Sequence, residues 1–218
     1  MRELNQLIMD FGYRKNYDEN DFFVSKSNYY AFNIIKKWPN WEKRIINIYG
    51  EKFSGKTHLA NILRIKSKPL YINAEKFSEK VLVDSKLYET IIIDDFDNNI
   101  EEKFFYSLFN LVDQDNKYLL INSKDSINSA KFLLPDMSSR AKLCLSVEIE
   151  KPDDELIFAI ILKNFSDRQI NLDKKIIEFI IKRINRSYSK IYEFIYKVDQ
   201  LSLKKKKPIN INTIKEIL

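Results

Sequence analysis

Residues Gly50-Glu51-Lys52-Phe53-Ser54-Gly55-Lys56-Thr57 fit the pattern G-x-x-x-x-G-K-[S/T] of a phosphate-binding loop. The loop follows the apolar run Ile45–Tyr49 and precedes the helical stretch Leu59–Leu63, the context that this motif requires. The chain contains only three glycines, and two of them stand at the spacing of the loop. Residue frequencies in this chain give a chance match in about one of a thousand such sequences. The sequence therefore predicts a nucleotide-binding α/β fold.

Each position of the loop has a chemical reason. Gly50 and Gly55 let the backbone curl around a phosphate, so that the successive N–H groups, including that of Ser54, point inward. A helix that begins near Lys56 adds its positive N-terminal end. We expect Lys56 to reach the β- and γ-phosphates and the hydroxyl of Thr57 to bind Mg²⁺. The expected cofactors are ADP or ATP with Mg²⁺.

An acidic pair follows a run of three isoleucines, Ile91–Ile93. Such a run suits a strand that is buried on both faces of a parallel sheet, and ligands bind at the carboxyl ends of such strands. We assign Asp94 to the Mg²⁺ shell, and Asp95 to orienting or deprotonating the attacking water. The alternative is a polar turn after a core strand, because Asp97 and Asn98 continue the polar run.

A second strand, Tyr118–Ile121, also ends in polar side chains. In a parallel sheet it lies beside the acidic strand, so that Asn122 or Ser123 would contact the γ-phosphate or the water. Turn formation by the Asn-Ser pair is the alternative.

Composition limits the class of protein. The chain has 218 residues, of which 44% are hydrophobic and 31% charged, as in ordinary globular proteins. No run approaches the length of a membrane span, the N-terminus lacks a secretory h-region, and the single Cys144 fits a reducing cytosol. We therefore expect a cytoplasmic protein without membrane contact. The net charge of +6 permits weak or indirect contact with DNA, but the lysines are spread along the chain.

Strand-like and helical runs alternate up to about residue 150, and helical runs follow. This order predicts a three-layer α/β domain with a parallel sheet, then a small helical lid domain. We expect an arm at 1–20, a nucleotide-binding domain at 21–150 and a lid at 151–218. The expected strands are Ile45–Tyr49, Leu70–Asn73, Thr90–Ile93, Tyr118–Ile121 and Lys142–Val147. The expected helices follow Lys56 and occupy Ile100–Val112, part of Ser126–Leu134, Asp153–Phe165, Leu172–Ile184, Ser187–Leu203 and Ile211–Leu218.

Several motifs resemble the DnaA branch of the AAA+ proteins, and within it the Hda group of DnaA-related regulators, especially alphaproteobacterial forms. They are the segments Asp21–Asn28, Trp38–Trp41, Gly55–Ala60, Leu134–Arg140 and Lys151–Leu156. The resemblance implies that Phe23 and Val24 lie against the adenine and that His58 belongs to the nucleotide site, although His58 also suits a plain helix surface. It further implies that Arg140 is an arginine finger, which acts on a nucleotide held by a neighbouring subunit.

Two features favour the Hda group over DnaA itself. The sequence ends at Leu218, directly after the expected lid, where DnaA continues into a DNA-reading domain. The segment Gln6-Leu7-Ile8-Met9-Asp10-Phe11 resembles the peptide with which Hda docks on the sliding clamp, the β subunit of DNA polymerase III. There Gln6 would enter a polar pocket, while Leu7, Met9 and Phe11 fill an apolar cleft. The alternative is an arm that packs on its own domain.

One position departs from the family. Ser189 stands where the lid carries its second sensor arginine, and Arg186 or Lys190 would have to substitute, or neither does. The resemblance implies a negative regulator of replication initiation that stimulates hydrolysis of ATP bound to DnaA, acting more as an activator than as an enzyme. It also leaves homo-oligomers open. The alternative is an autonomous AAA+ ATPase such as a helicase loader. A small-molecule kinase is disfavoured, because the lid helix from Asp153 to Lys163 contains no arginine.

Overall fold

The computed structural model describes residues 17–205 except 98, 169 and 171, together with 214, 215 and 217. Its centre is a parallel sheet with the strand order β2-β3-β4-β1-β5. The strands are β1 (Ile45–Gly50), β2 (Leu70–Asn73), β3 (Thr90–Phe96), β4 (Tyr118–Ser123) and β5 (Leu145–Ile149). Their interior residues are mostly isoleucine and leucine without exposed surface, as expected for a sheet covered on both faces.

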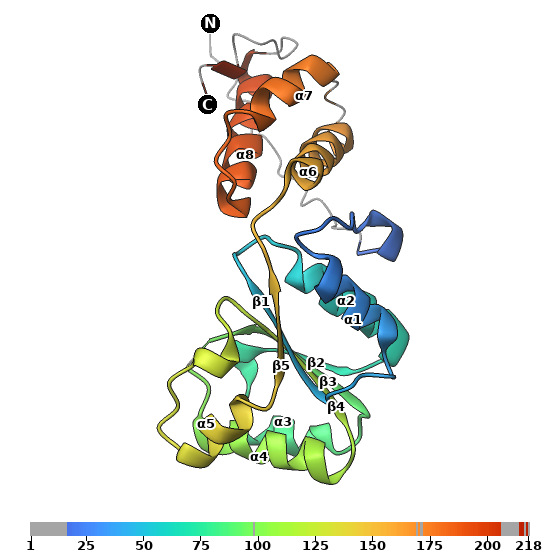
Figure 1. The fold of residues 1–218 in the computed structure, drawn as a ribbon, viewed down its shortest axis with the longest axis vertical. Helices are drawn as coiled ribbons and strands as arrows, with labels where there is room; N and C mark the ends of the chain where they lie inside the picture. Colours follow the sequence, from blue (N-terminus) through green and yellow to red (C-terminus); the bar gives the residue numbers. More distant parts are fainter. Residues whose placement is uncertain are drawn as a thin grey trace, which may run out of the picture.

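Helices cover the two faces of the sheet (Figure 1). On one face lie α1 (Tyr29–Lys37) and α2 (Lys56–Ser67), which pack on Ile46, Ile48 and Ile92. On the other lie α3 (Glu79–Ser85), α4 (Glu102–Gln114) and α5 (Pro135–Ala141). Here Phe105 of α4 is buried against Phe96 and Phe109, with ring centroids 4.9 and 5.0 Å away. The domain therefore has the three-layer α/β architecture that the sequence predicts.

Three further helices form a separate layer beyond the sheet: α6 (Asp154–Asp167), α7 (Lys174–Ile181) and α8 (Tyr188–Lys205). They share a core of their own that includes Ile161, Phe165 and Ile180. Two of their buried side chains, Leu156 of α6 and Tyr188 at the start of α8, belong instead to the core on the α1 and α2 side of the sheet. Tyr188 is 1% exposed. These two side chains join the helical layer to the nucleotide domain.

Single-turn 3₁₀ helices fill some of the connections: η1 (Glu19–Asp21), η2 (Ala74–Lys76) and η3 (Ile127–Ser129). Among the described residues, no helix combines the length and the apolar character that crossing a bilayer requires.

Most predicted elements are present, but the segment before β5 was predicted incorrectly. The strand expected at Lys142–Val147 begins only at Leu145, because Lys142 ends α5 and Cys144 N–H bonds back to the carbonyl of Ala141. The helix expected within 126–134 is only the single turn η3, and α5 starts later, at Pro135. Helices α1 and α3 had no counterpart in the prediction. Of the expected helix 211–218, residues 214 and 215 are helical and most others lie outside the described residues.

Candidate functional site

The phosphate loop connects β1 to α2 and depends on two glycines with positive φ. Gly55 has φ +101° at the N-cap of α2, a conformation that costs residues with a Cβ atom. A Cβ at Gly50 (φ +153°) would lie 2.8 Å from the carbonyl oxygen of Ile149, which is backbone and cannot move aside. Only glycine fits these two positions, which explains why the chain places two of its three glycines here.

Lys56 extends its side chain back across this loop. Its ammonium donates to the carbonyl oxygens of Gly50 at 2.7 Å and of Glu51 at 2.9 Å. Burial lowers the pKa of Lys56, and the charges of Asp95, Asp94 and Glu51 offset part of that effect. The loop thus holds a desolvated cation, which interacts strongly with an anion because little water screens it.

Two observations fit a phosphate in this loop. The hydroxyl of Ser54 is buried and has no hydrogen-bond partner among the described residues, whereas buried polar groups are normally paired. The first N–H groups of α2 also face the loop at this helix end, and Gly55 has no side chain that could cap them. The group that these residues fit is an anion with several acceptor oxygens.

Asp94, Asn122 and Tyr71 form a buried polar cluster at the carboxyl ends of three adjacent strands. The amide of Asn122 donates to Asp94 Oδ1 at 2.9 Å and to the carbonyl oxygen of Lys56 at 3.0 Å. The hydroxyl of Tyr71 donates to Asp94 Oδ2 at 2.5 Å. Asn122 therefore links the acidic strand directly to the phosphate loop, as its position in the sequence suggests.

Tyr71 was not predicted, although the sequence carries a signal for it. Residue 73 of β2 pairs in register with Asp94, so that β2 runs beside the acidic strand. Tyr71 lies two residues before Asn73 in the same strand, and this position in the sequence indicates a hydroxyl near the carboxylate of Asp94. Burial and the hydrogen bond to Asp94 raise the pKa of Tyr71, which remains a hydrogen-bond donor.

Asp95 differs from Asp94 in its surroundings. It is exposed, has φ +55° at an irregularity of β3, and accepts a hydrogen bond from the amide of Asn73 at 3.3 Å. Partial desolvation of the carboxyl and the neighbouring charge of Asp94 raise the pKa of Asp95, although Lys56 and Lys52 oppose this. The left-handed backbone turns this carboxyl out of the sheet, toward solvent rather than into the core.

Thr57, in the first turn of α2, and Asp94, near the carboxyl end of β3, carry a hydroxyl and a carboxylate, which are oxygen ligands of the kind that Mg²⁺ takes. No group of three or more His, Cys, Asp or Glu side chains suited to a metal occurs in the described part of the chain. A single carboxylate with one hydroxyl fits a cation that takes its remaining ligands from phosphate and water.

The segment before α1, residues 17–28 (the opening segment), lies against the phosphate loop through Phe22 rather than Phe23. The ring of Phe22 lies 3.0 Å from the position of a Cβ at Gly55, and it contacts His58 edge-on at a centroid distance of 5.2 Å. Phe23 is 48% exposed, and Val24 is half-buried. The pair of phenylalanines at 22 and 23 signals one inward and one outward ring, but not which is which.

His58 lies on α2 beside this segment. Its Nε2 is 2.8 Å from the carbonyl oxygen of Asp18, and its ring also contacts Tyr17. Burial lowers the pKa of His58. His58 therefore fastens the opening segment to α2, a more specific contact than a surface position would make.

Arg140 lies apart from the phosphate loop. It is on α5, where its guanidinium is 3.7 Å from Asp113 and 5.5 Å from the ring centre of Tyr106, both on α4. The side chain is 34% exposed. Asp113 and Tyr106 thus hold a guanidinium that is still partly exposed to solvent.

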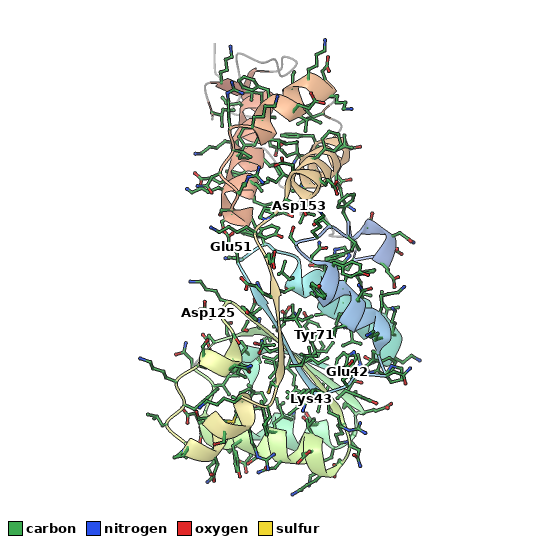
Figure 2. All side chains as sticks on the ribbon, viewed as in Figure 1. Glu42, Lys43, Glu51, Tyr71, Asp125 and Asp153 are labelled. Carbon is green, nitrogen blue, oxygen red and sulfur yellow. The ribbon has the colours of Figure 1, made fainter. Side chains whose placement is uncertain are left out.

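The lid contacts the loop without an arginine at the expected position. The N–H of Ser189 donates to the carboxylate of Glu51 at 3.1 Å. Arg186 pairs with Asp154 at 2.7 Å, and Lys190 pairs with Glu193 at 2.8 Å. Figure 2 shows Glu51 at the junction of the two layers, near Asp153. Sequence reasoning missed Glu51, because this loop position carries no motif requirement. Gln6, Leu7, Met9 and Phe11 lie outside the described residues.

Comparison with known proteins supports the same relationships. Residues 153–218 match the family model described as the Hda lid domain. DnaA, the chromosomal replication initiator protein of Borreliella burgdorferi, is 28% identical over 198 residues, which cover 78% of this chain. The chain spans only 40% of the length of that relative.

Solved structures give the same picture for the fold. Domain III of Thermotoga maritima DnaA aligns with a TM-score of 0.73 and 21% identity, covering 93% of this chain and 95% of that one. AMPPCP-bound DnaA from Aquifex aeolicus aligns with a TM-score of 0.68 and 21% identity over 85% of this chain and 65% of that one. The chain thus has the fold of DnaA domain III, is similar in sequence to DnaA over most of its length, and matches the Hda lid model in its C-terminal segment.

Proposed function

We propose that this protein binds an adenine nucleotide and lowers the activity of the replication initiator DnaA by stimulating hydrolysis of DnaA-bound ATP. The observation that carries the proposal is the position of Arg140, accessible on α5 and apart from the chain's own Lys56, Asp94 and Asn122. An arginine in such a place is suited to contact a nucleotide that another protein holds. The match to the Hda lid supports the same direction.

Nucleotide binding rests on the phosphate loop. The DnaA structure from Aquifex aeolicus contains AMPPCP, an ATP analogue, in a protein of the same fold. In this chain, Lys56 would neutralise phosphate charge, and the phosphate would accept a hydrogen bond from the unpaired hydroxyl of Ser54. Asp94 and Thr57 would hold Mg²⁺. Bound Mg²⁺ would screen the phosphate charges. We expect ADP or ATP to stabilise the protein as a structural cofactor.

Arg140 would act in trans. In contact with DnaA, its guanidinium would leave Asp113 and lie against the γ-phosphate held by DnaA. A delocalised cation there stabilises the charge that develops during phosphoryl transfer, an effect of about 10³–10⁵ in rate in known arginine fingers. The planar guanidinium suits the phosphate oxygens better than an ammonium would. Gln6, Leu7, Met9 and Phe11 would hold the protein on the sliding clamp, close to DNA but with weak or indirect DNA contact.

The test measures hydrolysis of DnaA-bound ATP in the presence of DNA-loaded clamp, with and without this protein. We expect stimulation by the unaltered protein and its loss with Arg140→Ala. Arg183→Ala is a matched control, because Arg183 also stacks on an aromatic ring, Phe179, but belongs to the lid. ADP binding by the Arg140→Ala protein shows that the variant is folded.

Stimulation that persists in Arg140→Ala would show that the finger is assigned wrongly. The second candidate, an autonomous ATPase, is favoured by Asp95, whose raised pKa and position beside Asp94 suit a general base. It predicts substantial hydrolysis without DnaA and its loss in Asp95→Asn. Arg140 variants would then leave that hydrolysis unchanged in the monomer.

A further inference from the structure

The lid helix α8 begins on a carboxylate that belongs to the phosphate loop. The N–H groups of Tyr188 and Ser189 donate to the two oxygens of Glu51 at 3.0 and 3.1 Å, and the hydroxyl of Ser187 donates to the same carboxylate. The first N–H groups of a helix lack partners within the helix and must find them elsewhere. In α8 two of them find a side chain from another domain.

The charge of this carboxylate suits its position. Burial opposes ionisation of Glu51, but the hydrogen bonds from Ser187, Ser189 and Tyr188 outweigh it and hold the pKa of this carboxyl below 4.5. An anion at a helix N-terminus is further stabilised by the helix dipole. The contact is therefore a charge-assisted cap rather than an incidental surface pair.

A second contact joins the same two elements one helical turn further on. The ring of Phe53, in the phosphate loop, lies 5.0 Å from that of Tyr192 on α8. Phe53 has φ +70°, a left-handed conformation that is unfavourable for a bulky residue. The loop therefore adopts an unfavourable backbone shape at the point where the lid supports it.

Glu51 connects this contact to the nucleotide site. While its side chain caps α8, its carbonyl oxygen accepts a hydrogen bond from the ammonium of Lys56. A phosphate that binds Lys56 meets the loop in the shape that Glu51 and α8 hold, so that a bound nucleotide and a docked lid favour the same loop conformation. Ser189, in the first turn of α8, offers its backbone N–H to Glu51.

We propose that Glu51 is a positioning residue that couples nucleotide binding to docking of α8, so that each favours the other. This inference rests on nucleotide binding in the proposed function, but not on any action on DnaA. Coupling free energies are reciprocal: if the docked lid strengthens nucleotide binding, nucleotide must strengthen lid docking by the same factor.

The experiment compares the full chain with Glu51→Ala and Glu51→Gln by calorimetric ADP titration with Mg²⁺ and by amide hydrogen exchange. Asp173→Ala is the matched control, because Asp173 caps α7 through the N–H of Lys175, at 3.0 Å, within the lid itself. Lys56→Ala marks the loss of the nucleotide site. We expect Glu51→Ala to weaken ADP binding about tenfold, in the usual range of coupling between sites, and Asp173→Ala to leave it unchanged.

In the unaltered protein, ADP should slow exchange of the amides of Tyr188 and Ser189. In Glu51→Ala these amides should exchange faster, and ADP should no longer protect them. Glu51→Gln retains an acceptor oxygen, so its ADP affinity and its amide exchange rates should lie between those of Glu51→Ala and of the unaltered protein. This variant keeps the test available if the alanine variant does not fold. Equal ADP affinity in Glu51→Ala and the unaltered protein would overturn the coupling alone. Absence of ADP binding in the unaltered protein would overturn the proposed function, and the coupling with it.

Discussion

At the scale of single residues, His58 provides an internal pH probe. It is the only histidine of the chain, and burial lowers its pKa despite the hydrogen-bonding carbonyl of Asp18. The folded protein therefore binds this proton less readily than the unfolded chain, whose histidine has the usual pKa of 6.5. Its contribution leaves stability unchanged well above pH 6.5 and reduces it as the pH falls through 6.5 toward the folded-state pKa.

We expect the imidazole signals in an NMR titration to show a midpoint below 6.5. Urea unfolding should give a lower free energy of unfolding at about pH 5.5 than at about pH 7.5. His58→Gln, which does not titrate, should lose most of this difference. A midpoint at or above 6.5 would contradict the burial of the ring against Phe22 and Tyr17.

Motif residues were the most predictable part of the site. Gly50, Gly55 and Lys56 have roles that depend on backbone geometry and charge within eight consecutive residues, so the sequence alone contains the information. Glu51 and Tyr71 were missed because their partners lie on other elements, 137 and 23 residues away in the contacts with Tyr188 and Asp94. Such contacts depend on the packing of strands and domains, which no local pattern encodes.

At the scale of elements, the ends of β2, β3 and β4 meet at Asp94. Tyr71→Phe removes the hydroxyl that donates to this buried carboxylate and keeps the ring. We expect the free energy of unfolding to fall by about 1.5–3 kcal/mol, the usual range for a hydrogen bond to a charged group. Because Mg²⁺ would no longer compete with the hydroxyl, half-maximal ADP binding should require less Mg²⁺.

Chemical denaturation and ADP titration at several Mg²⁺ concentrations measure both effects. Tyr30→Phe is the control, because Tyr30 is 72% exposed on α1. Unchanged stability together with unchanged Mg²⁺ dependence would mean that the Tyr71 hydroxyl does not hold the carboxylate.

Elements with a clear period were predictable, and those with mixed signals were not. Triple isoleucine identified β3, and its alternation with helical stretches gave the parallel sheet. The segment Lys142–Leu145 misled because its leucines alternate with other residues as in a strand. Pro135 instead starts α5 as its first residue, and the turn at Leu143 leaves that side chain 69% exposed.

At the scale of the whole molecule, Tyr188 is the largest side chain that joins the lid to the core of the sheet domain. The lid core is formed mainly by α6, α7 and α8 in the described residues, and a unit of this size is only marginally stable alone. Tyr188 is buried in the core of the nucleotide domain, and its hydroxyl donates to the carbonyl oxygen of Glu150 at 3.0 Å. The lid therefore derives part of its stability from the sheet domain.

Tyr188→Ala should lower the free energy of unfolding by about 3–5 kcal/mol, as for other large buried aromatic residues. The substitution should also separate the unfolding of the lid from the unfolding of the nucleotide domain. Both tryptophans, Trp38 and Trp41, pack on the nucleotide domain, so their fluorescence reports its unfolding, while far-UV circular dichroism reports all helices. In urea, helix loss should begin before the fluorescence change in Tyr188→Ala and coincide with it in the unaltered protein.

Phe109→Ala is the control for this prediction. Phe109 is 1% exposed in the core on the α4 side of the sheet, away from the lid. Its removal should reduce stability by a similar amount, yet the two signals should still change together, because a lid that depends on the sheet domain unfolds with it. Coincident transitions in Tyr188→Ala would show that the lid is joined to the sheet domain mainly by other contacts, with Glu51 and the Phe53–Tyr192 pair as the first to test.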